Sequence, residues 1–502
     1  MERILTAKTA DKDGSDVKVS GWVDARRDHG KIIFIDLRDR SGVLQCVFVP
    51  SFAPPSPEAT EGHSKASEGK PGKDNVYNIG NSLRSEWVVE LEGKISKRPE
   101  KMVNPNLPTG TIELQVSGIK ILNECITPPF DITAGGMEIG EELRMKYRYL
   151  DLRRARLQKN VRIRHKMAQF IREWLSEKDF VEIETPILTK STPEGARDYV
   201  VPSRLQNGKF YALPQSPQQY KQLLMVSAFE RYFQIARCFR DEDTRGDRQP
   251  EFTQLDMEMS FVEREDVIDL NEELLISLVK KLFPEKKIQE VPFPRISYGE
   301  AMEKYGTDRP DMRKDKEDQN LLAFCWVIDF PFFEPSSTEG DSGVLALRSS
   351  EGAKKWTFTH NPFSAPKPEH MEWLMKKENI GNILTTQYDV ALNGFEIGGG
   401  SVRNHRPEPL KKVFEIMGFS EERIMNNFGH MIEALSYGAP PHGGIAWGFD
   451  RIVSILANEH NIREVIPFPK TGDGRDLMMG APSEVSFEQL KELGLKIAKE
   501  SK

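Results

Sequence analysis

The most informative stretch of the sequence is residues 239–258, which read FRDEDTRGDRQPEFTQLDME. We interpret it as a strand, a loop and a returning strand. Side chains alternate along a strand with a period of two, which places Arg240 and Glu242 on one face. The same period places three polar side chains on one face of the returning strand: Gln254, Asp256 and Glu258. Two interpretations are open, a solvated and salt-bridged hairpin or a pocket in which polar groups converge on a ligand.

A second stretch, residues 443–451, reads GGIAWGFDR and leads into an apolar run over 452–456. Glycine and apolar residues are typical of a buried strand against which a ligand can press closely. The apolar spacing after Asp450 predicts a helix with Arg451 in its first turn, where the helix dipole disfavours a cation. A ligand phosphate would reverse that cost, because helix N-termini and arginine both favour anions. The segment therefore predicts contact with phosphate.

The N-terminal part of the chain alternates apolar and polar residues in five short segments, which predict β-strands. The segments are 17–23, 32–37, 44–49, 86–92 and 112–116. Five short strands in one small domain favour an OB-type barrel, a fold that holds single-stranded bases by aromatic stacking and backbone charge. Arg26, Arg27 and Lys31 supply charge near Phe34. Phe34 itself is open to two interpretations, a core residue or a platform for a base.

Together, the first two stretches resemble motifs 2 and 3 of the class II aminoacyl-tRNA synthetases. Residues 180–186, FVEIETP, resemble motif 1, whose proline lies at the dimer interface in that family. Three further stretches resemble the aspartyl branch of the class: 192–199 (TPEGARDY), 215–221 (QSPQQYK) and 398–403 (GGGSVR). The resemblance runs from about Gly21 to Pro482. It implies an α+β protein, with an N-terminal OB-type β-barrel followed by an antiparallel sheet flanked by helices.

The resemblance also implies ATP-dependent ligation of L-aspartate to tRNA through an aspartyl-adenylate. Positioned arginines and Mg²⁺ stabilise the negative charge of such a reaction, and no protein nucleophile is required. In the family, the residue matching Arg240 bridges the α-phosphate and the substrate carboxylate, and that matching Arg451 holds the γ-phosphate. These two are the implied catalytic residues. The implied ATP-binding set is Arg240, Asp241, Glu242, Gln249, Glu396, Gly448, Phe449, Asp450 and Arg451.

The aspartate side chain is a short carboxylate, which a cationic fork recognises best. The resemblance gives this role to Arg403, assisted by Lys221. The implied aspartate-binding set is Glu194, Gln218, Lys221, Arg240, His360 and Arg403. Most relatives have a second histidine after the one that matches His360, and this chain has Asn361 there.

Asn393-Gly394 is a strong signal for a two-residue hairpin turn. Such a turn pairs Ala391 with Glu396 and brings Asp389 diagonally opposite Glu396. Two carboxylates and nucleotide phosphates are suitable ligands for Mg²⁺, and the family binds its metal on the matching acids. If no ion binds, the two acids require a basic partner.

One residue of the barrel bears on the choice of tRNA. The family binds the tRNA anticodon through the positions matching His29, Phe34 and Gln45. Histidine at position 29 resembles the relaxed enzymes that charge both tRNA-Asp and tRNA-Asn, whereas strict bacterial enzymes tend to have leucine. A relaxed enzyme implies a glutamine-dependent amidotransferase as a partner. The alternative is that His29 only caps a turn.

We expect residues 1–126 to form the anticodon-binding domain, 127–158 a basic hinge, and 159–502 the catalytic domain. Ten basic residues and one acid between Arg144 and Lys166 predict contact with RNA, or else a basic helix packed on its own domain. The polar segment 51–75 predicts a disordered loop, and the polar segment 335–355 is a second insertion. Residues 305–311 run almost directly into 326–331, so the insertion domain that bacterial relatives carry between motifs 2 and 3 is expected to be absent.

Composition agrees with a cytoplasmic enzyme. The chain is 38% hydrophobic and 29% charged, with a net charge of −7. No apolar run is long enough to span a membrane, the N-terminus lacks a signal-peptide pattern, and the cysteines lack metal or disulfide spacing. An asparaginyl or lysyl ligase is an alternative, although a neutral amide needs no cationic fork. A non-catalytic tRNA-binding paralogue is another, although the motif arginines and metal acids are all present.

Overall fold

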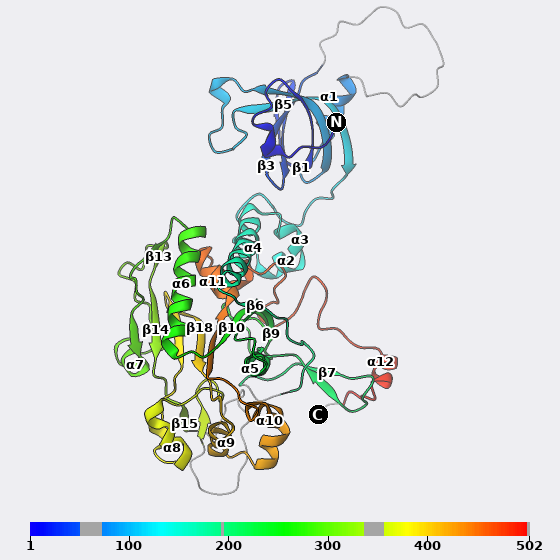
Figure 1. Cartoon of the computed structure of the whole chain (residues 1–502). Coiled ribbons are helices and arrows are strands. Elements are labelled where there is room, and N and C mark those ends of the chain that lie inside the picture. The colour runs from blue at the N-terminus through cyan, green and yellow to red at the C-terminus, as the bar shows by residue number, and fades with distance from the viewer. Residues whose placement is uncertain (51–72, 192–194, 336–355, 499–502) are drawn as a thin grey trace, which may run out of the picture. The chain divides into compact units, whose positions relative to one another are not determined.

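The computed structural model describes residues 1–50, 73–191, 195–335 and 356–498 (Figure 1). It divides into two compact units, Met1–Gly136 and Met137–Lys502. Segment 51–72, Glu194 and segment 336–355, for which the sequence makes predictions, lie outside the described residues.

The first unit is a closed five-stranded barrel with strand order β1-β2-β3-β5-β4, as the alternating sequence predicts. The strands are β1 (Asp16–His29), β2 (Ile32–Asp39), β3 (Gly42–Phe48), β4 (Val88–Lys97) and β5 (Ile112–Asn123). Alternate residues such as Val19, Ile35 and Leu91 are fully buried and form its core. The intervening side chains therefore point to the outer surface of the barrel, where polar groups can lie.

One helix of the first unit was not predicted. Helix α1 (Lys73–Ser82) lies between β3 and β4, and its first three residues belong to the segment expected to be disordered. Val76 from this helix joins the barrel core, and a side chain at Gly80 would collide with the ring of Phe48. Close packing against the barrel therefore favours a helix that polar composition alone does not indicate.

The second unit is built on a sheet whose described strands follow the order β12-β14-β17-β18-β19-β10-β9-β6. The strands are β6 (Val181–Glu182), β9 (Arg231–Phe239), β10 (Glu251–Ser260), β12 (Arg295–Ser297), β14 (Phe324–Ile328), β17 (Tyr388–Leu392), β18 (Phe395–Val402) and β19 (His442–Gly448). The central strands are antiparallel as expected. The edge strands β12 and β6 pair in parallel with β14 and β9, so the sheet is mixed rather than antiparallel throughout.

The two faces of this sheet differ because its strands alternate. Leu255 and Met257 of β10 belong to a buried cluster with residues of three helices. The helices are α4 (Ala155–Ser176), α6 (Arg264–Leu282) and α11 (Phe449–Leu456). Gln254, Asp256 and Glu258 lie on the opposite face and are also buried. The solvated-hairpin interpretation is therefore wrong.

The remaining helices and short strands lie around this sheet (Figure 1). The α-helices are α2 (Glu141–Lys146), α3 (Arg148–Asp151), α5 (Gln218–Val226), α7 (Tyr298–Tyr305), α8 (Met371–Lys376), α9 (Pro407–Ile416), α10 (Glu421–Leu435) and α12 (Phe487–Glu492). The short strands are β7 (Val200–Pro202), β8 (Phe210–Ala212), β11 (Lys287–Ile288), β13 (Leu321–Leu322), β15 (Phe333–Pro335) and β16 (Trp356–Phe358). The 3₁₀ helices are Thr6–Thr9, Glu100–Met102, Pro368–His370, Ile380–Asn382 and Ile462–Glu464.

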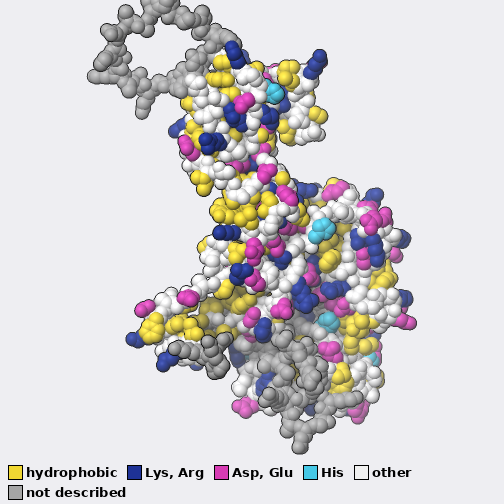
Figure 2. Space-filling view, turned by 180° about the vertical axis from the view of Figure 1, so that it is seen from behind, with side chains coloured by type: hydrophobic (Ala, Val, Ile, Leu, Met, Phe, Trp, Pro, Cys, Tyr) yellow, Lys and Arg dark blue, Asp and Glu magenta, His cyan; other side chains and the backbone are white. Residues whose placement is uncertain are grey.

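The basic run after Arg144 does not form a hinge. Arg144, Arg148 and Arg154 are buried in the second unit, and each bonds to the carboxylate of Asp151. Arg144 also pairs with Glu464 at 2.7 Å. The prediction of RNA contact is wrong for these three arginines, because buried cations need buried acids and the acids come from within the same unit. On the face shown in Figure 2, basic and acidic side chains of this unit are interspersed.

The connection that follows α7 is short. The helix ends at Gly306, whose φ of 68° suits a glycine, and the chain reaches β13 at Leu321. Asp311 accepts hydrogen bonds from the guanidinium of Arg313 within this connection. No folded domain intervenes between these described residues.

Candidate active site

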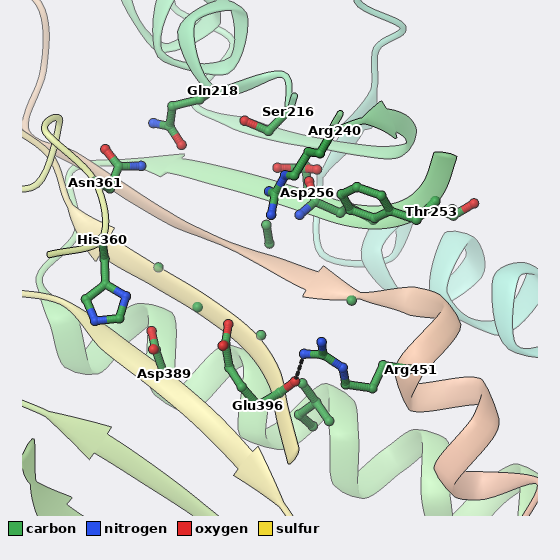
Figure 3. Close-up of a pocket in the computed structure, with 18 of the residues that line it drawn as sticks. Ser216, Gln218, Arg240, Thr253, Asp256, His360, Asn361, Asp389, Glu396 and Arg451 are labelled. Atoms are coloured by element: carbon green, nitrogen blue, oxygen red, sulfur yellow. Dashed lines mark hydrogen bonds between the residues drawn. The ribbon is translucent and has the colours of Figure 1, made fainter. Parts of the chain in front are cut away.

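A cavity of about 390 Å³ opens on the polar face of the large sheet. Its walls come from the loop between β9 and β10, the polar face of β10, the start of α5, and strands β17, β18 and β19 (Figure 3). Most of the predicted site residues line it: Gln218, Lys221, Arg240, Glu242, Gln249, His360, Asp389, Glu396, Arg403, Gly448, Asp450 and Arg451. Segments far apart in the sequence therefore meet in one pocket.

Two predicted residues do not line this pocket. Phe449 is buried in the hydrophobic core, where the guanidinium of Arg164 lies 5.0 Å from its ring centre. It points away because it occupies the apolar face of α11. The backbone N–H of Asp241 donates to the carbonyl of Arg197, which holds Asp241 at the rim.

The floor of the pocket contains two cations, Arg403 and Lys221, and the carboxylate of Asp256. A second carboxylate, Glu258, contacts both cations without lining the cavity. Arg403 donates from Nε to Glu258 Oε1 at 2.8 Å and from Nη1 to Ser401 Oγ at 2.7 Å. Lys221 Nζ lies 3.1 Å from Asp256 Oδ1 and 3.4 Å from Glu258 Oε2. All four charged side chains are almost completely buried. Such a cluster is held in one geometry, because each charge compensates the burial of its neighbours.

Asp256 and Glu258 are site residues to which the sequence assigned a face but no role. Glu258 holds the fork of Arg403 in place, and the Arg403 and Lys221 cations hold the pKa of its carboxyl below the usual range despite burial. Burial raises the pKa of Asp256, and its Oδ2 atom is buried without a hydrogen-bond partner. An unsatisfied carboxylate oxygen beside a pocket is ready to accept from a ligand donor. The sequence signal that could have identified Asp256 and Glu258 as site residues was the period of two that they share with Gln254.

Glycine at position 444 permits this cluster. A Cβ built at Gly444 would lie 2.2 Å from Glu258 Oε2 and 2.1 Å from the carbonyl oxygen of Met257. The sequence predicted a close approach by a ligand to this glycine-rich strand, whereas at Gly444 the neighbouring strand β10 and its carboxylate make the close approach.

Two further arginines, Arg240 and Arg451, line the pocket (Figure 3). The guanidinium of Arg240 lies over the ring of Phe252, 5.0 Å from its centre. Arg451 donates to the backbone carbonyl of Glu396, and its Nη2 lies 3.2 Å from Asp247 Oδ2. The Nε atom of Arg451 is buried without a partner. Both guanidinium groups therefore keep donors for an anionic ligand.

Two further predicted residues have structural partners. The carboxylate of Asp450 accepts from the backbone N–H of Thr253 at 2.8 Å and from Arg164 of α4. It therefore ties the start of α11 to β10. The Oε1 atom of Gln249 accepts from the backbone N–H of Lys470 at 2.7 Å, which attaches the loop of residues 240–250 to the C-terminal segment.

The acidic hairpin forms with the predicted pairing of Ala391 with Glu396. A bulge follows, so Asp389 pairs with Gly399. A Cβ at Gly399 would lie 2.6 Å from Asp389 Oδ1 and 3.6 Å from Glu396 Oε1, so both carboxylates converge over this glycine. Burial and the neighbouring Glu396 charge raise the pKa of Asp389 well above its usual value.

This acidic pair fits a divalent cation. Within the described part of the chain, no lysine or arginine forms an ion pair with either carboxylate, and Asp389 accepts only from Gln387 Nε2 at 3.2 Å. Two hard oxygen ligands without a compensating cation match Mg²⁺, which takes its other ligands from phosphates and water. The described residues hold no group of three or more potential metal ligands, so the protein alone supplies an incomplete shell.

We expect Asp389→Asn to raise the melting temperature in EDTA at pH 8. When the pKa of a carboxyl is higher in the folded than in the unfolded protein, the protein loses stability as the pH rises from the unfolded pKa to the folded pKa. The pKa of Asp389 is raised in this way, and asparagine does not ionise. Relief of about 1 kcal/mol corresponds to roughly 1 °C in a unit of this size. Thermal melts at pH 5 and pH 8 measure the difference, which should grow at the higher pH.

Asp311→Asn is the matched control for this prediction. Hydrogen bonds from Arg313 lower the pKa of Asp311, so this substitution should reduce the melting temperature at pH 8. A lower melting temperature for Asp389→Asn in EDTA would contradict the like-charge interpretation of the acidic pair.

The departure from the family pattern at Asn361 has a local structural role. Asn361 lines the pocket beside His360, and its Oδ1 accepts from the backbone N–H of Phe363 at 2.7 Å. Burial lowers the pKa of His360, whose ring stands edge-on to Phe330 at 4.9 Å. His360 is therefore neutral at pH 7, and Asn361 adds an amide in place of a second titrating ring.

The three predicted anticodon residues lie together on the barrel of the first unit. The rings of His29 and Phe34 meet edge to face with their centres 5.7 Å apart. Phe34 is half-buried rather than a core residue. Gln45 pairs with Asp36 on the adjacent strand and donates from Nε2 to Glu113 Oε2 at 2.9 Å. A polar and aromatic surface of this kind suits single-stranded bases.

Family models match both units of the chain. Residues 140–472 match "tRNA synthetases class II (D, K and N)", and residues 17–122 match "OB-fold nucleic acid binding domain". No helix in the described part of the chain is long and apolar enough to cross a membrane.

Close relatives extend over nearly the whole chain. The aspartate–tRNA(Asp/Asn) ligase of Desulfatibacillum aliphaticivorans is 38% identical over 611 positions, covering 97% of this chain and 96% of the relative. The aspartate–tRNA ligase of Staphylococcus saprophyticus is 40% identical over 594 positions, covering 96% and 97%. Because the chain has 502 residues, both relatives contain segments that it lacks.

Solved structures share the fold. Asparaginyl-tRNA synthetase from Pyrococcus horikoshii, complexed with asparaginyl-adenylate, matches with a TM-score of 0.70 and 20% identity, covering 94% of this chain and 98% of that one. A putative aspartyl-tRNA synthetase from Leishmania major matches with a TM-score of 0.68 and 20% identity, covering 93% and 94%.

Proposed function

The chain belongs to the class II tRNA synthetases of the D, K and N group, and on that premise we propose that it charges both tRNA-Asp and tRNA-Asn with L-aspartate. Aspartylation of tRNA is the reaction that its relatives share. The observation that supports aspartate in this pocket is the buried cluster of Lys221, Arg403, Asp256 and Glu258.

This cluster can distinguish a carboxylate from an amide. Lys221 and Arg403 both line the pocket, and Glu258 fixes the guanidinium of Arg403. A substrate carboxylate adds the negative charge that two cations can share, whereas a neutral amide leaves their charge-assisted bonds weaker. The unpaired Oδ2 of Asp256 provides an acceptor for the ammonium group of the same amino acid.

The activation step requires the substrate carboxylate to attack the α-phosphorus of ATP, with pyrophosphate as the leaving group. Arg240, beside the amino-acid subsite, stabilises the charge that develops on the α-phosphate. Arg451 holds the γ-phosphate from the start of α11. The 3′-terminal ribose hydroxyl of tRNA then takes the aspartyl group, and AMP leaves.

Asp389 and Glu396 are the residues that would hold Mg²⁺. When bound there, the ion neutralises the charge of the ATP phosphates. The strand backbone orients the two carboxylates, because Gly399 lets both acids face the pocket without a side chain between them.

The first experiment is charging of purified tRNA-Asp and tRNA-Asn transcripts with labelled aspartate, ATP and magnesium. Charging of both supports the relaxed enzyme. Charging of tRNA-Asp alone leaves a strict aspartate ligase. Absence of both charging and aspartate-dependent pyrophosphate exchange would favour a non-catalytic paralogue.

His29→Leu should lower the charging of tRNA-Asn relative to tRNA-Asp by at least about tenfold, because a lost base contact costs roughly 1–3 kcal/mol. The relevant contact is to the third anticodon base, in which the two tRNAs differ, and His29 is exposed beside Phe34. Initial charging rates on the two transcripts measure the ratio. The same substitution at exposed His460 in the second unit is the control, and an unchanged ratio for His29→Leu would remove this residue from tRNA selection.

Three further parts of the proposal follow from the family. A homodimer would form around Pro186, where Val181, Ile187 and Leu188 expose 45%, 41% and 53% of their surface. Asp-tRNA-Asn would require a glutamine-dependent amidotransferase to become Asn-tRNA-Asn. We place the enzyme in the cytoplasm and propose that the insertion domain of bacterial relatives is absent.

A further inference from the structure

Behind the pocket lies a chain of polar side chains that the proposed reaction does not use. Gln218 Nε2 lies 3.0 Å from Gln222 Oε1, one turn further along α5. Gln222 Nε2 lies 3.2 Å from His442 Nε2 of β19, and His442 Nδ1 lies 2.8 Å from the carbonyl oxygen of Pro440. Gln222 and His442 are fully buried, and only Gln218 reaches the pocket.

The direction of each hydrogen bond in this series follows from the backbone carbonyl of Pro440, with which the series ends. A backbone carbonyl can only accept, so His442 Nδ1 carries the proton and donates to Pro440. In the neutral ring Nε2 then accepts, which requires the NH₂ group of Gln222 to face it. Gln222 Oε1 consequently accepts from the NH₂ group of Gln218. The remaining atom of that carboxamide, Gln218 Oε1, is directed toward the middle of the pocket (Figure 3).

The surroundings of His442 favour the neutral ring. Three charged or titratable groups act on it, Glu258 from β10 and Arg403 and His405 from the segment after β18. Glu258 and the Pro440 carbonyl raise the pKa of His442, whereas Arg403 and His405 lower it, and burial lowers it most. The net pKa is below the usual value for histidine.

We propose that Gln222 and His442 are positioning residues that hold the Gln218 carboxamide with its oxygen toward the ammonium group of the amino-acid substrate. This inference rests on the proposed function. Together with Asp256 Oδ2, the oxygen of Gln218 gives the pocket two acceptors for one ammonium group, and neither acceptor has a protein partner among the described residues.

A reversed carboxamide would oppose binding. If Gln218 turned by 180°, its oxygen would face Gln222 Oε1 and its NH₂ group would face the ammonium. Two buried acceptors in contact repel each other, which favours the observed orientation by roughly 5- to 150-fold. Without Gln222 this preference disappears, because no other described residue hydrogen-bonds to the Gln218 carboxamide and so distinguishes its oxygen from its NH₂ group.

Gln222→Met tests the inference, since methionine has a similar volume and neither donates nor accepts strongly. We expect the KM for aspartate in pyrophosphate exchange to rise about twofold, because only about half of the Gln218 carboxamides then present their oxygen to the substrate, with kcat and the KM for ATP nearly unchanged. This split follows because the ammonium group is bound equally in the ground state and the transition state. If Gln222→Met does not fold, Gln222→Asn replaces it, because the shorter side chain cannot span both neighbours.

A double-mutant cycle separates positioning from a general structural role. Gln218→Leu removes the acceptor itself, so adding Gln222→Met to it should raise the KM for aspartate no further. Gln219→Met is the matched control, since Gln219 also bonds to a histidine, His430 at 2.8 Å, but does not line the pocket.

The outcomes are distinct. An unchanged KM in Gln222→Met, or independent and multiplying effects of the two substitutions, would overturn the positioning role. Absence of aspartate-dependent exchange in the unaltered enzyme would instead refute the proposed function before any variant is made.

Discussion

Arg240→Gln is expected to lower the rate of aspartate-dependent pyrophosphate exchange about 10³-fold while the protein remains folded. One preorganised donor to a developing negative charge contributes about 10²–10³ in rate. Among the described residues no carboxylate forms an ion pair with Arg240, whose guanidinium lies against Phe252. Its removal therefore leaves no buried acid without a partner. Single-turnover formation of the adenylate, measured together with thermal melts, separates catalysis from stability.

Arg248→Gln is the matched control for this prediction. Arg248 belongs to the same loop and the same pocket, but its side chain is 44% exposed and its nearest acid is Glu242 at 3.9 Å. A distant, exposed ion pair contributes little, so the loss of exchange should be within about tenfold. Equal losses in the two variants would mean that general positive charge, rather than the position of Arg240, drives activation.

The second large effect concerns the choice of amino acid. The double variant Arg403→Gln/Glu258→Gln should raise the KM for aspartate about 100-fold. A hydrogen bond to a charged group contributes about 1.5–3 kcal/mol, and the variant removes the guanidinium that supplies it. Pyrophosphate exchange over a range of aspartate concentrations measures the change.

The double substitution is chosen because a single one would obscure the result. Arg403→Gln alone leaves Glu258 buried and short of a cation, which costs about 3–5 kcal/mol of stability. Removing both charges leaves the net charge of the cluster unchanged, and the double variant should melt at a higher temperature than the single variant.

The equivalent double variant in the barrel, Arg38→Gln/Glu86→Gln, is the control. That pair is also close, at 2.7 Å, and Glu86 is also buried, but it lies in the other unit. It should leave the KM for aspartate unchanged. Retention of a normal KM by Arg403→Gln/Glu258→Gln would place the aspartate carboxylate elsewhere.

Local patterns in the sequence were sufficient to predict several parts of the fold and of the site. The barrel strands were predicted because each alternates apolar and polar residues, and residues 32–37 lie in β2 while 44–48 of the predicted 44–49 lie in β3. The pairing of Ala391 with Glu396 was predicted because Asn393-Gly394 defines a two-residue turn, whereas the bulge that follows and shifts the next pairs was not predicted. Periodicity and turn chemistry act over a few residues, so one sequence contains them in full.

Other expectations failed where the outcome depended on a distant partner. The basic run was interpreted as RNA-binding, yet Arg144 pairs with Glu464, which is 320 positions away. The first three residues of helix α1 belong to the segment predicted to be disordered, and the helix packs on the barrel through Val76. Phe449 stands between two pocket residues in the sequence but packs into the core.

The sequence alone determined which residue types are present, their strand and helix periods, and through resemblance the family and its reaction. Only the tertiary structure decided which charges neutralise one another. Asp256 and Glu258 share a strand face with Gln254, and nothing in that period shows that Lys221 and Arg403 reach them from α5 and the end of β18. The physical reason is that Coulomb interactions and hydrogen bonds depend on distance in space, which the fold sets between segments far apart in the chain.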